Sequence, residues 1–80
     1  MADHYVVLTR PNCGWCDRVF RLIEENGDTY SYYDVTADFV FRDFLKDNGV
    51  ATVPQVFCDG EWIGGHDDFR AWMANDHTDH

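Results

Sequence analysis

Apolar residues occur along the chain in short blocks whose spacing alternates between a strand-like and a helix-like pattern. The apolar run 5–8 predicts a buried strand, and residues 29–35, rich in aromatic and β-branched side chains, predict a second one. Between them, four apolar residues share the i, i+3, i+4 spacing of one helix face: Val19, Phe20, Leu22 and Ile23. Gly27 is expected to end that helix.

The second half of the chain continues the alternation. Thr36 is predicted to cap a second helix that Gly49 closes, and its apolar side is expected to consist of Val40, Phe41, Phe44 and Leu45. Residues 55–58 and 61–63 predict two strands joined by an Asp59-Gly60 hairpin turn. A last helix is expected to begin near Asp67 and Asp68 and to bury Phe69, Trp72 and Met73, before a polar tail, 75–80, that is expected to fray.

The resulting element order, βαβαββα, spans residues 1–80 without an internal repeat or a linker, so a single domain is expected. The first two strands are joined through a helix, which predicts that they are parallel with a right-handed crossover. The last two strands form an antiparallel hairpin. The expected fold is therefore α/β, with a four-stranded mixed sheet flanked by three helices.

Composition and charge narrow the possible function. Hydrophobic residues make up 45% of the chain and aromatic residues 16%, which excludes a disordered tail. No apolar run approaches the roughly 18 residues of a membrane span, and the N-terminus lacks the features of a secretory signal, so a cytoplasmic protein is expected. The net charge of −9 argues against nucleic-acid binding and fits either a salty cytosol or ordinary drift of a small acidic surface.

Cys13 and Cys16 form a C-x-x-C motif where the first predicted strand passes into the first helix. Three cysteines cannot form a disulfide framework, so this spacing indicates redox or metal chemistry. The free N–H groups and the dipole of a helix N-terminus stabilise a thiolate at Cys13, and three of the six basic residues lie near it in sequence: Arg10, Arg18 and Arg21. Cys16 is expected to be more buried and to resolve a mixed disulfide.

Two other interpretations of these cysteines stay open. A zinc site would need Cys58 and histidines as its remaining ligands, and two inert, buried cysteines would need no partner at all. Cys58 lies in a predicted core strand and is expected to be an inert apolar residue. Five further residues are expected to be packing or solvated side chains rather than functional ones: Trp62, Trp72, His4, His77 and His80.

Three motifs together resemble the signatures of glutaredoxins, in register over essentially the whole chain: Cys13-Gly14-Trp15-Cys16, Thr52-Val53-Pro54-Gln55 and Gly64-Gly65-His66-Asp67-Asp68. The resemblance implies a thioredoxin-like fold and a glutathione-dependent disulfide oxidoreductase, with Cys13 as nucleophile and Cys16 as resolving thiol. It also implies glutathione as reductant and disulfide or glutathionylated proteins as clients, with ribonucleotide reductase as one family-type client. We expect a monomer.

The same resemblance implies a glutathione site. Val53 and Pro54 resemble the family's cis-proline turn, whose exposed backbone pairs with glutathione strand to strand; alternatively, Pro54 merely starts a strand. Gly65 allows close backbone approach. The N–H groups of His66 and Asp67, with the Asp67 carboxylate, resemble the family's clamp on the γ-glutamyl end; Asp67 could also serve as a helix N-cap.

Some positions depart from the family's pattern. Gly14-Trp15 stands where Pro-Tyr is common, so Trp15 keeps an aromatic platform while Gly14 loosens the turn. Arg10 replaces the usual lysine, and arginine also binds a carboxylate. Phe41 occupies the position that often holds the glycine carboxylate of glutathione, which makes Arg42 the candidate for that contact if the helix is rotated.

Gly14 is also consistent with a second function. In the family, a small residue at this position is associated with a [2Fe–2S] cluster that bridges two protomers through glutathione and the nucleophilic cysteine, here Cys13. A third alternative is a thioredoxin-like protein reduced by a flavoenzyme, and the 64–68 motif argues against it.

Overall fold

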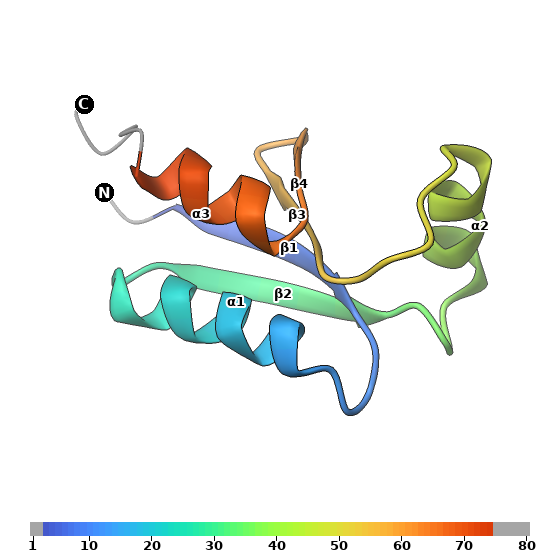
Figure 1. The fold of residues 1–80 in the computed structure, drawn as a ribbon, viewed down its shortest axis with the longest axis horizontal. Helices are drawn as coiled ribbons and strands as arrows, with labels where there is room; N and C mark the ends of the chain where they lie inside the picture. The colour runs from blue at the N-terminus through green and yellow to red at the C-terminus, as the bar shows by residue number, and fades with distance from the viewer. Residues whose placement is uncertain (1–2, 75–80) are drawn as a thin grey trace.

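The computed structural model of the chain describes residues 3–74, so the predicted frayed tail 75–80, with His77 and His80, lies outside the described residues. The elements follow the predicted order: β1 (His4–Thr9), α1 (Gly14–Glu25), β2 (Thr29–Asp34), α2 (Phe39–Asp47), β3 (Gln55–Cys58), β4 (Glu61–Gly64) and α3 (His66–Ala74). The strands form one mixed sheet in the order β2-β1-β3-β4 (Figure 1). As predicted, β1 and β2 are parallel, and β3 and β4 form an antiparallel hairpin.

The main core lies between one face of the sheet and the helices α1 and α3. Alternation along β1 directs Tyr5 and Val7 to this face, and both side chains are buried. They join a single cluster whose other buried members come from α1, β3 and α3: Val19, Ile23, Val56, Cys58 and Phe69. Burying a large apolar side chain contributes roughly 1.5–3 kcal/mol, so this cluster holds the two helices against the sheet.

Helix α2 packs on the opposite face. Phe57 alternates with the core-facing Val56 and Cys58, and its ring centroid lies 5.9 Å from that of Phe44 on α2. The Phe44 ring also lies 5.3 Å from the ring of Trp62 on β4. Figure 1 shows α2 beyond one end of the sheet, and these contacts come from its C-terminal half.

The predicted four-residue apolar face of α2 is wrong in part. Leu45 is buried, but Val40 is 76% exposed. Phe41 packs instead against Tyr33, with ring centroids 4.7 Å apart. Val40 therefore does not reach the core, whereas Phe41 contacts β2 and Phe44 contacts β3 and β4.

The predicted cap of α2 is also wrong, because the helix begins later than the sequence suggests. The N-cap is Asp38, whose Oδ1 accepts hydrogen bonds from the N–H groups of Val40 (3.1 Å) and Phe41 (3.3 Å). Thr36 instead donates from its N–H and its hydroxyl to Asp34 Oδ1, at 2.8 and 2.6 Å. The Asp34 carboxylate therefore closes a turn that delays the start of the helix.

The β3–β4 hairpin turns at Asp59-Gly60 as predicted. Both residues have positive φ, 51° and 82°, which is what a type I′ turn requires. Within residues 3–74, no helix combines the length and the apolarity needed to cross a membrane.

Candidate active site

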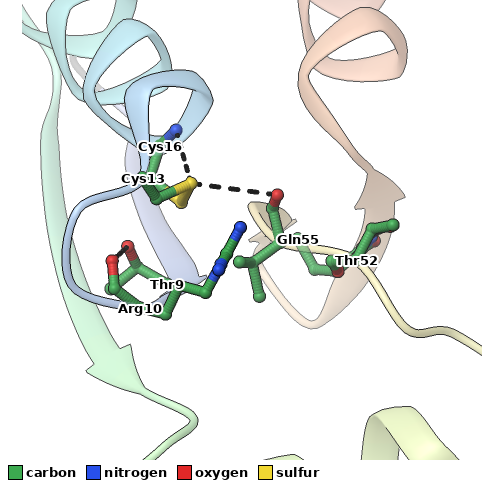
Figure 2. Close-up of a disulfide and its surroundings, with 7 residues drawn as sticks. Thr9, Arg10, Cys13, Cys16, Thr52 and Gln55 are labelled. Carbon is green, nitrogen blue, oxygen red and sulfur yellow. Dashed lines mark hydrogen bonds between the residues drawn. A yellow bond between two sulfur atoms is a disulfide. The ribbon is translucent and has the colours of Figure 1, made fainter.

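Cys13 is the N-cap residue of α1, as the sequence predicts. Its backbone is extended (φ −111°, ψ 105°), and its Sγ accepts a hydrogen bond from the Cys16 N–H at 3.2 Å. The two cysteines form a disulfide with their Cα atoms 5.2 Å apart (Figure 2). In the reduced protein, the same N–H and the helix N-terminus would stabilise a thiolate at Cys13.

The two sulfur atoms differ in accessibility. Cys16 is 1% exposed and lies in the core, whereas Cys13 is 6% exposed. Cys13 Sγ also lies 3.9 Å from the carbonyl oxygen of Val53, a contact marked in Figure 2. Cys13 is therefore the more exposed of the two cysteines, in agreement with the predicted order of burial.

The segment that faces Cys13 contains a cis peptide bond between Val53 and Pro54, as the sequence predicts. Strand β3 begins one residue later, at Gln55. Within residues 3–74, the Val53 N–H has no hydrogen-bond partner, while its carbonyl oxygen faces the disulfide. Val53 therefore offers both backbone polar groups to an extended ligand beside the sulfur atoms.

A first cleft, of about 810 Å³, extends from Trp15 and Val53 to the start of α3. The first hydrogen bond of α3 runs from the Phe69 N–H to the Gly65 carbonyl oxygen (2.9 Å), so Gly65 precedes the helix and Asp67 lies inside its first turn. The interpretation of Asp67 as an N-cap is therefore wrong. The N–H groups of residues 66–68 lack intrahelical acceptors, and the 97% exposed Asp67 carboxylate lies beside them.

Two glycines that line this cleft precede α3. Gly64 has a φ of 127°, and a Cβ there would collide with the Asp68 carboxylate. A Cβ on Gly65 would lie 3.5 Å from the Pro54 carbonyl oxygen. Position 64 therefore requires glycine, whereas a Cβ at position 65 would make only an ordinary van der Waals contact with the cis-proline turn.

A second cleft, of about 710 Å³, lies on the other side of Trp15 and Val53. It is lined by three of the six basic residues in a chain of net charge −9: Arg10, Arg42 and Lys46. The Nε of Arg42 lies 3.7 Å from Asp43 Oδ1, and its guanidinium stacks on Phe39. In Figure 2, Arg10 extends toward the segment that carries Thr52 and Gln55.

Trp15 separates the two clefts. Its side chain is 54% exposed, its ring centroid lies 4.9 Å from that of His66, and the Arg18 guanidinium lies 4.8 Å from the ring centroid. His66 Nδ1 lies 3.0 Å from Asp67 Oδ1, so the His66 ring is held by both neighbours. The predicted aromatic platform is therefore present beside Cys13.

Gln55 is a site residue to which the sequence interpretation gave no role. Its buried amide donates from Nε2 to the Thr52 carbonyl oxygen (3.1 Å) and Oγ1 (3.4 Å), and its Oε1 accepts from Trp62 Nε1 (2.9 Å). This network fixes the turn that carries Val53. A glutamine directly after the Val-Pro pair was a signal in the sequence, but only the structure shows its partners.

Cys58 cannot join Cys13 and Cys16 in a zinc site. Cys58 pairs with Tyr5 at the start of β1, whereas Cys13 follows the end of β1, and the strand from Tyr5 to Thr9 spans roughly 13 Å. Burial, with Asp59 and Asp3 nearby, raises the pKa of Cys58 to about 11, which keeps its thiol protonated at neutral pH.

Within residues 3–74, one protomer offers no complete donor set for an iron–sulfur cluster. Cys16 is bonded to Cys13, and the single group of three metal-ligating side chains among these residues is Asp3, Cys58 and Asp59 at the other end of β3. A Cβ on Gly14 would meet no atom within 4 Å, so packing does not require glycine there.

Together, a C-x-x-C disulfide at the N-terminus of α1 and a cis-proline turn against it, on a four-stranded mixed sheet, define a thiol–disulfide oxidoreductase of the thioredoxin-like fold. The glutaredoxin family model matches residues 5–63. The chain therefore belongs to the glutaredoxin family.

Individual relatives agree with this assignment. The chain is 34% identical over 76 residues to glutaredoxin 1 of Escherichia coli K12, and the match covers 85% of this chain and 89% of that relative. It is 40% identical over 76 residues to a glutaredoxin of Haemophilus influenzae, and the match covers 85% of this chain and 87% of that relative. Among solved structures, a Brucella melitensis glutaredoxin superposes with a TM-score of 0.78 at 30% identity (99% and 86% covered). A buckwheat glutaredoxin–glutathione complex gives 0.77 at 29% identity (89% and 68% covered).

Proposed function

We propose that this glutaredoxin is a glutathione-dependent oxidoreductase that reduces glutathionylated proteins and protein disulfides through Cys13. The observation that carries the proposal is that two clefts of different polarity share Trp15 and Val53, whose carbonyl oxygen lies 3.9 Å from Cys13 Sγ. The solved buckwheat relative in complex with glutathione supports the same ligand.

The charged groups that line the two clefts favour one orientation of bound glutathione. Its γ-glutamyl end carries both an ammonium and a carboxylate, and the first cleft offers the Asp67 carboxylate together with the free N–H groups of α3. Its glycine end carries a carboxylate alone, and the second cleft offers Arg10 and Arg42. The central cysteine of glutathione then lies beside Val53, whose free N–H and carbonyl oxygen pair with it as a strand would.

Reduction of a glutathionylated protein needs only Cys13. The Cys13 thiolate attacks the glutathione sulfur, the protein thiolate leaves, and a Cys13–glutathione disulfide forms. A second glutathione thiolate attacks the glutathione sulfur of this intermediate, which releases glutathione disulfide and restores the Cys13 thiolate. Trp15 and Val53 hold the glutathione moiety so that its sulfur faces Cys13 in both steps.

Reduction of a protein disulfide also needs Cys16. Cys13 attacks one client sulfur, and Cys16 then attacks Cys13 Sγ, which releases the second client thiolate and leaves the Cys13–Cys16 disulfide found in this structure. One glutathione opens this disulfide at Cys13, and a second releases Cys13 as above. Ribonucleotide reductase stays a predicted client.

Two serine variants test the proposal in an assay of a small glutathione mixed disulfide, with NADPH and glutathione reductase regenerating glutathione. We expect Cys13→Ser to abolish activity and Cys16→Ser to keep it, because only the second route uses Cys16. Reduction of a protein disulfide should be lost in both variants. Equal loss of mixed-disulfide reduction in both would contradict the assignment of Cys13 as sole nucleophile, and activity without glutathione would contradict its role as reductant.

A further inference from the structure

A third hollow, of about 260 Å³, lies between α1 and α3, outside the two clefts assigned to glutathione. Arg18 and Arg21 line it from α1, His66 and Arg70 line it from α3, and Leu22 is its one apolar lining residue. Half of the six basic residues of a chain with net charge −9 therefore gather in one small hollow.

Among the described residues, these arginines have no acidic ion-pair partner. Among residues 3–74, the two ion pairs are Arg42–Asp43 and His66–Asp67, and no acidic side chain lines the hollow. The contact of Arg18 is with the ring of Trp15. Arg18 and Arg21 lie three residues apart on α1, a spacing at which like charges repel, so the arrangement is unfavourable until an anion enters.

The hollow adjoins the redox site. His66 lines both the hollow and the first cleft. Arg18 and His66 both contact the ring of Trp15, which lines the first cleft two residues after Cys13 in the chain. A polypeptide whose disulfide reaches Cys13 can therefore pass Trp15 and place neighbouring residues between α1 and α3. Glutathione has only two carboxylates, and the two clefts already account for both.

We propose that this hollow binds aspartate or glutamate side chains that flank the reactive disulfide of a client protein. Guanidinium groups suit this ligand, because their planar N–H pairs match a carboxylate. The inference rests on the proposed function, since it names the class of protein client that the Cys13 site prefers.

The test compares two peptides with the same disulfide, one flanked by Asp and Glu residues and the other by Asn and Gln. The kcat/KM for each is measured with glutathione as reductant at about 0.15 M salt, where the Debye length is about 8 Å. We expect the wild-type protein to reduce the acidic peptide about three- to fivefold faster, which corresponds to a few exposed ion pairs. The net charge of −9 alone predicts the opposite preference.

Arg70→Gln should lower this preference about twofold and leave kcat/KM for the neutral peptide unchanged. Arg70→Lys, which keeps the charge, should retain most of the preference. Lys46→Gln is the matched control, because it removes one positive charge outside the hollow, and its ratio of acidic to neutral peptide should equal that of the wild type.

The outcomes separate the two proposals. Equal kcat/KM values for both peptides in the wild type, or an equal loss of preference in Lys46→Gln and Arg70→Gln, would overturn the carboxylate site and leave the glutathione-dependent activity standing. Failure of glutathione to support reduction of either peptide would overturn the proposed function itself.

Discussion

Replacing Arg10 by glutamine tests how the second cleft recognises glutathione. Arg10 and Arg42 both line this cleft, but Arg42 already contacts Asp43 and the ring of Phe39, whereas Arg10 has no ion-pair or aromatic partner among residues 3–74. The free guanidinium of Arg10 is therefore the better candidate for the glycine carboxylate. Arg10 is exposed, so the contact belongs to the class of exposed ion pairs, worth about 0.2–1 kcal/mol. Its loss should weaken recognition up to roughly fivefold.

The assay tests the contact from both sides, because the glycine carboxylate of glutathione is altered as well as Arg10. A glutathionylated peptide is compared with the same peptide carrying glutathione amidated at its glycine carboxyl. Single-turnover transfer of the glutathione moiety to Cys13 is followed by mass spectrometry in a Cys16→Ser background. Arg10→Gln should slow transfer from the normal substrate up to about fivefold at low salt and should not affect the amidated one. Arg42→Gln should have a smaller effect.

Salt provides a further check, because the Debye length falls from about 10 Å at 0.1 M to about 3 Å at 1 M. The difference between Arg10→Gln and the wild type should therefore nearly vanish at the higher concentration. An equal defect with the amidated substrate would refute the reasoning and indicate that Arg10 acts on the Cys13 thiolate. An unchanged rate at low salt would show that another residue holds the carboxylate.

Two further predictions follow from buried side chains. Gln55→Met removes an amide that satisfies Thr52 and the indole N–H of Trp62, so it should lower the free energy of unfolding by about 1–3 kcal/mol in urea titrations. Trp62→Phe should lower the free energy of unfolding less in the Gln55→Met background than in the wild type. Strictly additive losses would contradict a hydrogen bond shared by these two side chains. Burial and nearby carboxylates raise the pKa of Cys58 to about 11, so its neutral thiol should resist iodoacetamide at pH 7–8 while Cys13 of the reduced protein reacts. Modification of both at similar rates would contradict this.

The sequence was sufficient for features that depend on neighbouring residues. The order of strands and helices followed from periodicity, the Asp59-Gly60 turn from the residues that accept positive φ, and the position of Cys13 from the junction of an apolar run and a helical pattern. The cis Val53-Pro54 bond was predicted through a motif resemblance rather than from local chemistry.

Predictions from the local sequence were wrong where more than one nearby residue suited the same structural role. Thr36 and Asp38 are both good capping residues, and the Asp34 carboxylate decided between them by binding Thr36. Val40 fits an apolar helix face by spacing, yet it stays exposed while Phe41 and Phe44 contact the strands. Spacing shows which residues share a face, but not how much of that face the sheet covers.

Only the tertiary structure could decide which distant residues share a site. Arg21 and Arg70 lie 49 positions apart in the printed sequence, and they line one hollow because the buried core brings α1 and α3 together. Arg10 and Arg42 likewise meet in one cleft through the packing of α2, and Gln55 finds Trp62 across the β3–β4 hairpin. The apolar core holds the elements together and so brings side chains that are far apart in the chain into one site. The periodicity of each element shows which of its faces is apolar, but not which other element packs beside it.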